Sequence, residues 1–70
     1  MSYRKLRGKI REVYGSQDAF AADMGVNPST MSAKLTGKTD WSVKEAELAC
    51  RLLGISLEEM HIYFFAPEVA

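Results

Sequence analysis

The chain has 70 residues and a mass of 7.8 kDa, which leaves room for one domain with one hydrophobic core and is too short for most enzyme folds. Apolar residues make up 47% of the sequence and charged residues 26%, so we expect a folded domain. The single cysteine, Cys50, excludes an internal disulfide, and the single histidine, His61, leaves no cluster of metal ligands. No apolar run reaches the roughly 20 residues of a membrane helix, and no apolar segment follows the basic N-terminus, so we predict a cytoplasmic protein without a membrane partner.

The net charge is zero, but the charged residues are segregated along the chain. Residues 1–38 carry seven basic and three acidic side chains, a net charge of +4, whereas residues 39–70 carry two basic and six acidic ones, a net charge of −4. A domain divided in this way can turn a basic face toward a polyanion and an acidic face away from it. Two solvated helix faces of opposite sign would give the same pattern, so charge alone leaves both interpretations open.

Residues that begin and end helices follow one another closely, and the sequence therefore predicts an all-α fold of five helices. The first predicted helix starts at the candidate N-cap Ser2 and ends near Gly15. Its apolar residues recur at three- and four-residue steps and form its inner face, made of Tyr3, Leu6, Ile10 and Val13. Gly8, in the middle of this helix, is expected to permit the close approach of another helix.

The second and third predicted helices are short and are separated by only three residues. Ser16 caps the second helix, and Gly25 ends it in the left-handed conformation that glycine adopts easily. Asn27 caps the third helix, Pro28 takes its first position, where the missing N–H costs nothing, and Gly37 ends it. The residues expected to face the core are Phe20, Ala21 and Met24 in the second helix and Met31 and Leu35 in the third.

Two further helices are predicted by capping boxes, in which a serine is followed three residues later by a glutamate. Ser42 and Glu45 begin the fourth helix, and Gly54 ends it. The inner face of this helix is predicted to be Val43, Ala46, Ala49, Cys50 and Leu53. Ser56 and Glu59 begin a short fifth helix around Leu57 and Met60, and residues 61–70 form the tail.

Residues 16–37 have the arrangement of a helix-turn-helix, in which two short helices joined by a tight turn cross at roughly 90 to 120°. At eleven positions the sequence resembles the lambda-repressor and Cro-like (XRE-type) helix-turn-helix family, namely Gln17, Phe20, Ala21, Met24, Gly25, Val26, Ser29, Thr30, Met31, Ser32 and Gly37. The resemblance covers about residues 3–60. It is strongest to short phage-borne regulators, in which lysine and leucine precede a Thr36-Gly37-Lys38 segment and an aromatic run closes the chain.

The resemblance implies one compact, lambda-repressor-like domain over residues 1–70 that binds double-stranded DNA and regulates transcription, as a phage or prophage repressor or Cro-like protein does. The sequence departs from the family at one pair of positions. Many members place an arginine on the first helix against an acidic residue near the end of the third, where this chain has Ile10 and Leu35. An apolar pair of similar volume is often neutral or stabilising relative to a buried ion pair, so the predicted fold is unchanged.

In that family the N-terminal part of the third helix enters the major groove. By position, the base-reading residues are Pro28, Ser29, Ser32 and Ala33. Small hydroxyl and methyl side chains discriminate weakly between bases, so we expect modest direct specificity. The expected DNA-backbone contacts are Ser16, Gln17, Lys34, Thr36, Lys38 and Thr39. The alternative is that the lysines and the Ser32 hydroxyl are ordinary solvated surface groups.

The C-terminal segment, residues 61–66, is predicted to mediate dimerisation because its consecutive apolar and aromatic residues cannot all face one small core. The predicted interface residues are Ile62, Tyr63, Phe64 and Phe65. A homodimer would place two third helices about 34 to 36 Å apart on a pseudo-palindromic operator. In the alternative, Ile62 and Phe65 fold back over the first helix and complete the core.

The remaining residues with distinctive chemistry have structural interpretations. Trp41 is expected to fold onto Ala46 as a hydrophobic staple, and Cys50 to be a small core residue. No nucleophile with a base and an orienting group is present, so we expect neither catalysis nor a metal, cofactor or small-molecule ligand. The alternative function is a helical protein–protein interaction module, antirepressor- or antitoxin-like, that keeps the fold without binding DNA. The small, uncharged outer face of the third helix favours this alternative, whereas the basic N-terminal half argues against it.

Overall fold

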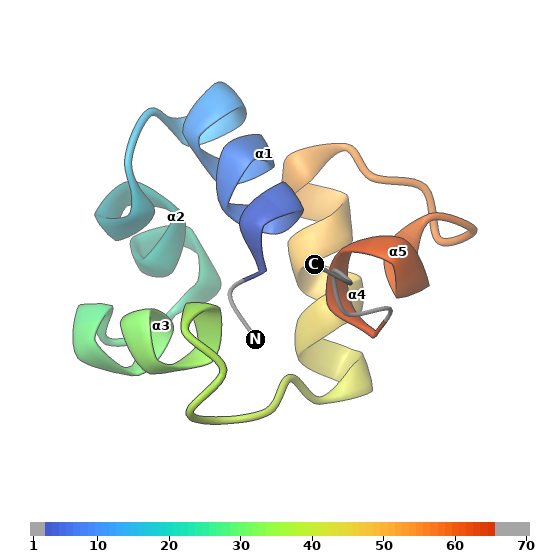
Figure 1. Cartoon of the computed structure of the whole chain (residues 1–70). Coiled ribbons are helices and arrows are strands. Elements are labelled where there is room, and N and C mark those ends of the chain that lie inside the picture. Colours follow the sequence, from blue (N-terminus) through green and yellow to red (C-terminus); the bar gives the residue numbers. More distant parts are fainter. Residues whose placement is uncertain (1–2, 66–70) are drawn as a thin grey trace.

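Within residues 3–65, which the computed structural model describes, the chain folds into five α-helices and no strand. The helices are α1 (Arg4–Tyr14), α2 (Gln17–Met24), α3 (Pro28–Leu35), α4 (Val43–Leu53) and α5 (Met60–Phe64). Figure 1 shows α1 in the middle, with α2 and α3 on one side of it and α4 and α5 on the other. α1 contacts α2, α4 and α5, so it joins the two helix pairs. The predicted all-α class is confirmed for this part of the chain.

The helix boundaries follow the predicted caps over the middle of the chain. The Ser16 hydroxyl accepts a hydrogen bond from the Ala19 N–H at 3.1 Å and so caps α2. At the start of α4, the Glu45 N–H donates to the Ser42 hydroxyl at 3.1 Å, and the Ser42 N–H donates to Glu45 Oε1 at 2.9 Å. This reciprocal pair is the predicted capping box, which is therefore confirmed.

Both ends of the described chain differ from the predicted boundaries. α1 begins at Arg4 after Tyr3, which has a left-handed φ of 49°, and the predicted cap Ser2 lies outside the described residues. The fifth helix begins at Met60 and not at Ser56, so the second predicted capping box does not start a helix. Ser56 does hydrogen-bond Glu59, at 3.3 Å between the hydroxyl and Oε1, but the backbone there closes tight i to i−3 turns before the helix begins.

The core is built from the inward faces of all five helices. Its buried residues are Tyr3, Leu6, Ile10, Phe20, Ala21, Met24, Met31, Leu35, Trp41, Ala46, Ala49, Cys50, Leu53, Ile55 and Phe64. Val13 and Val43, predicted to face inward, are instead 45% and 57% exposed. Tyr14 replaces Val13, since its ring packs on Phe20 at 5.3 Å between centroids, and Val43 is the first residue of α4, ahead of the part that reaches the core.

An aromatic cluster closes the core between the start of α1, the loop before α4, and α5. Trp41 lies edge-on to Phe64 at 4.8 Å between ring centroids and to Tyr3 at 6.4 Å. The buried Phe64 is therefore a core residue, and its prediction as a dimer contact is wrong. The alternative, in which Ile62 and Phe65 complete the core, is wrong too, because these side chains are 38% and 45% exposed.

Helical geometry explains which residues of α5 turn inward. Met60 and Phe64 are four residues apart and so share the face that packs on the core, with Met60 half-buried. Ile62 and Phe65 lie on the remaining surface. The sequence pattern of residues 61–66 gives no helical register, so it does not separate the two groups.

Candidate nucleic-acid interface

α2 and α3 pack against each other across a short turn that Gly25 makes possible. Gly25 has a left-handed φ of 71°, at which any residue with a Cβ would be strained. Its N–H donates to the Ala22 carbonyl at 3.1 Å, and the Val26 N–H donates to the Ala21 carbonyl at 2.9 Å. These hydrogen bonds give partners to carbonyl groups in the last turn of α2, and the turn leads the chain directly into α3.

The start of α3 is fixed by its cap, as the sequence predicts. Asn27 Oδ1 accepts a hydrogen bond from the Ser29 N–H at 2.7 Å, and Pro28 occupies the first position of the helix. Met31 and Leu35 are buried, which turns the opposite side of α3 to solvent.

The four predicted base-reading residues lie on this outer side of α3. Pro28, Ser29 and Ser32 are exposed, and Ala33 is half-buried. Thr30 is exposed beside them and was not among the predicted site residues. The N-terminal half of α3 thus presents hydroxyl and methyl groups and no charge.

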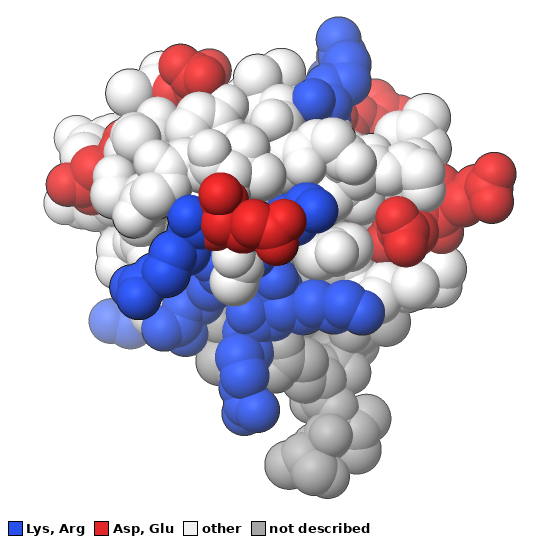
Figure 2. Space-filling view, turned by 90° about the horizontal axis from the view of Figure 1, so that it is seen from above, with Lys and Arg blue, Asp and Glu red and all other residues white. Residues whose placement is uncertain are grey.

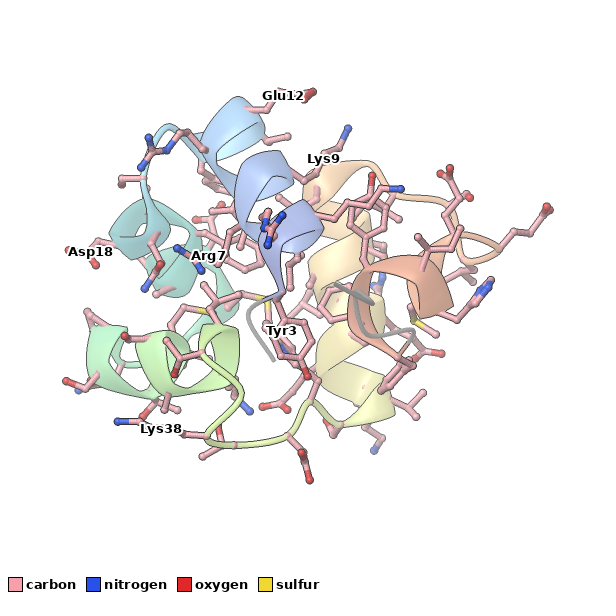
Figure 3. The ribbon with its side chains drawn as sticks, in the orientation of Figure 1. Tyr3, Arg7, Lys9, Glu12, Asp18 and Lys38 are labelled. Atoms are coloured by element: carbon pink, nitrogen blue, oxygen red, sulfur yellow. The ribbon has the colours of Figure 1, made fainter. Side chains whose placement is uncertain are left out.

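The predicted backbone contacts fall into two groups, at the start of α2 and after α3. At α2, Ser16 is exposed and Gln17 half-buried. After α3, Lys38 and Thr39 are exposed, and Figure 3 shows Lys38 beside α3. The exposed Thr36 has its hydroxyl engaged locally, since it donates to the Ser32 carbonyl at 3.0 Å.

Lys34 is the predicted backbone contact that the structure places elsewhere. Its side chain is only 9% exposed, and its Nζ donates to Glu45 Oε1 at 2.9 Å and to the Asp40 carbonyl at 3.2 Å. The ammonium also lies 5.5 Å from the centre of the Trp41 ring. A phosphate contact would require these interactions to break, so we correct the prediction. Lys34 ties the end of α3 to the start of α4.

The Glu45 carboxylate accepts the hydrogen bond from Lys34 and also takes part in the capping box of α4. Its pKa lies below the usual glutamate value, first because the carboxylate accepts the Ser42 N–H and further because Lys34 is bound to it, although partial burial acts in the opposite direction. The carboxylate is therefore charged when it holds α3 and α4 together.

A basic hollow of about 620 Å³ lies between α1 and the start of α2. It is lined by Arg4, Arg7, Gly8, Ile10, Arg11, Ser16, Gln17 and Leu35. Figure 2 shows lysine and arginine side chains gathered along one side of the molecule, and in Figure 3 Arg7 extends from α1 toward α2. The hollow thus joins two predicted backbone contacts, Ser16 and Gln17, to three arginines that were not predicted as site residues.

The arginines of α1 could have been found from their spacing. Arg4, Arg7 and Arg11 stand at i, i+3 and i+7, which places them on one helix face, with Gly8 between them. The prediction that Gly8 permits the close approach of another helix is wrong, because a Cβ at this position would meet no atom within 4 Å. The glycine faces open space in the hollow.

In residues 3–65, no group of three or more His, Cys, Asp or Glu side chains could hold a metal ion. Over the same residues, no helix has the length and apolar character needed to cross a membrane.

These features define a small all-helical protein with a basic hollow beside an uncharged, exposed helix face. The chain belongs to the DUF739 family, "Protein of unknown function (DUF739)", which it matches over residues 1–67. A comparison with curated proteins found no match.

Proposed function

We propose that the protein binds double-stranded DNA in a sequence-specific way and regulates transcription, as a phage or prophage repressor or Cro-like protein would. In this proposal α2 and α3 form a helix-turn-helix, and the N-terminal half of α3 lies in the major groove. The observation that carries the proposal is the exposure of Pro28, Ser29 and Ser32 at the start of α3, on a domain with basic groups gathered along one side.

The residues divide into those that read bases and those that hold the backbone. Ser29 and Ser32 offer hydroxyl groups that donate or accept, and the Ala33 methyl can pack on a thymine methyl. In this proposal Gln17, at the first position of α2, and Lys38, in the loop after α3, contact phosphates. Lys34 is left out of this group because its ammonium is bound to Glu45.

The lack of charge on the exposed side of α3 also supports a second candidate, a helical protein–protein interaction module that keeps the fold without binding DNA. No arginine or asparagine lies on the exposed side of α3 to make a bidentate base contact. Selection of bound duplexes from a random pool, followed by anisotropy measurements at several salt concentrations, separates the two. Enrichment of a two-fold symmetric sequence and a linear fall of log K with log[salt] support DNA binding, and no enrichment with salt-independent binding supports the interaction module.

We further propose that the active form is a homodimer that pairs through the exposed residues of the C-terminal segment. Ile62 and Phe65 are exposed and Tyr63 is half-buried, so these three remain of the four predicted interface residues. Leu57, 63% exposed just before α5, adds apolar surface in the same region of the chain. Sedimentation with and without operator DNA tests the proposal, because a monomer under both conditions would exclude it.

A further inference from the structure

We propose that the hollow between α1 and α2 is a phosphate-binding site that takes either a phosphate of the DNA backbone or the phosphate of a free, phosphorylated molecule. The first case rests on the proposed function, but the second does not. Three features of the hollow support the proposal, namely its charge, the glycine in its lining and the N-terminal end of α2, which also lines it.

The lining of the hollow is positively charged. Arg4, Arg7 and Arg11 project from one face of α1, and the described residues that line the hollow include no aspartate or glutamate. The acidic residues nearest in sequence are directed elsewhere. Glu12 pairs with Lys9 at 3.5 Å, and in Figure 3 Asp18 points away from α1 on the far side of α2. Arginine is the side chain best suited to phosphate, since its planar donors match two phosphate oxygens at once.

Gly8 is the second feature, because it has no structural reason to be glycine. Glycine in the middle of a helix is destabilising relative to alanine. At Gly8 neither close packing nor a left-handed backbone requires it, since an added Cβ would meet nothing within 4 Å and the residue lies inside α1. What the missing side chain does is keep the hollow open between the arginines.

The N-terminal end of α2 is the third feature. Gln17 is the first residue of this eight-residue helix and lines the hollow together with its cap Ser16. The first N–H groups of a helix have no partner within the helix, and the helix dipole favours an anion there. An anion in the hollow would therefore meet arginines from α1 and backbone donors from α2.

Apolar side chains line part of the hollow as well. The lining includes Ile10 and Leu35, which are both buried. An apolar wall lowers the local dielectric and so strengthens the attraction between the arginines and a phosphate.

The test uses the full chain and a matched pair of variants, Arg7→Gln and Lys9→Gln. Both remove one positive charge from α1, but Arg7 lines the hollow, whereas Figure 3 shows Lys9 on the opposite side of the helix. Pyrophosphate is titrated in the absence of DNA at constant ionic strength, and the backbone amide signals of Gly8 and Gln17 are followed by NMR. We expect saturable shifts at these amides, a loss of affinity of about tenfold or more in Arg7→Gln, and a change below about twofold in Lys9→Gln.

Gly8→Leu blocks the hollow without changing charge. Leucine is a good helix former, so this variant should fold, which the emission of the single, buried Trp41 and the thermal transition verify. A folded Gly8→Leu that binds pyrophosphate as tightly as the wild type would overturn the proposal. So would the absence of saturable shifts in the wild type.

The same variants with DNA distinguish the two phosphate sources. Weaker DNA binding in Arg7→Gln than in Lys9→Gln assigns the site to a backbone phosphate, and equal DNA binding with weakened pyrophosphate binding assigns it to a free phosphorylated molecule. If DNA is not bound but pyrophosphate is, the proposed function fails and the phosphate site stands. If DNA is bound and the two variants behave alike toward both ligands, the phosphate site fails and the proposed function stands.

Discussion

Replacing Lys34 by methionine should destabilise the fold, because the ammonium joins α3 to α4. Methionine keeps most of the buried stem and removes two hydrogen bonds, to Glu45 Oε1 and to the Asp40 carbonyl. Exposed ion pairs contribute about 0 to 1 kcal/mol, and breaking a fully buried pair costs about 3 to 5 kcal/mol. The Lys34 side chain is 9% exposed and that of Glu45 34%, which is between these limits. We therefore expect the free energy of unfolding to fall by about 2 kcal/mol.

For a chain of this length, a decrease of about 2 kcal/mol lowers the melting temperature by about 8 to 16 °C. The assay is thermal and urea unfolding followed by circular dichroism and by Trp41 fluorescence. Lys44→Met is the matched control, since Lys44 is exposed on α4 and the same substitution there should change the stability by less than about 0.5 kcal/mol.

A double-mutant cycle with Glu45→Gln isolates the contact itself, and we expect a coupling of about 1 to 2 kcal/mol between positions 34 and 45. If the free energy of unfolding of Lys34→Met is within about 0.5 kcal/mol of the wild-type value, or if the coupling energy is near zero, the ammonium does not hold the helices together. If Lys34→Met also lowers the slope of log K for DNA binding against log[salt], Lys34 contacts a phosphate after all.

Three further predictions concern DNA contact, the C-terminal segment and acid stability. In anisotropy titrations, Lys38→Ala should weaken binding to all sequences alike. It should also lower the slope of log K against log[salt] by about 0.9 for each phosphate that the variant no longer neutralises. Ser32→Ala should instead change the base preference and leave this slope unchanged. Phe64→Asp should unfold the domain because it buries a charge in the core, whereas Ile62→Asp should leave a folded monomer. Circular dichroism and sedimentation measure both outcomes, and a folded Phe64→Asp variant would contradict the assignment of Phe64 to the core. The pKa of Glu45 is lower in the folded state than its ordinary value of 4.5. The charged carboxylate therefore stabilises the fold fully above pH 4.5, and this stabilisation is lost as the pH falls through the lowered pKa. The free energy of urea unfolding should accordingly depend less on pH below 4.5 in Glu45→Gln than in the wild type.

The helix starts and stops in the middle of the chain were predictable because each depends on local chemistry. Ser16, Asn27 and Ser42 cap helices through hydrogen bonds to residues two or three positions later, and Gly25 adopts a backbone conformation that few other residues tolerate. The capping box at Ser56 shows the limit of this reasoning. The same side-chain pair forms, but the backbone closes tight turns before the helix begins, so the cap signal alone did not place the start of α5.

The functions of individual charged and aromatic side chains were harder to predict, because they depend on contacts between distant segments. Lys34 meets a glutamate eleven residues away, and Phe64 meets Trp41, which is more than twenty residues away. A lysine at the end of a predicted DNA-reading helix and an aromatic in a C-terminal run carry no local signal of these partners. Sequence reasoning therefore assigned both to the surface.

The hollow brings buried apolar residues and exposed arginines together on one surface. Ile10 of α1 and Leu35 of α3 are both buried, and both line the hollow. The arginines of α1 that line it are exposed and lie outside the core. Gly8 completes the arrangement, since any larger residue would occupy the space that these arginines share with the start of α2. A change at Ile10 or Leu35 would disturb the core and the hollow together, whereas a change at Gly8 alters the hollow and leaves the core packing in place, so the proposed phosphate site is best tested through Gly8.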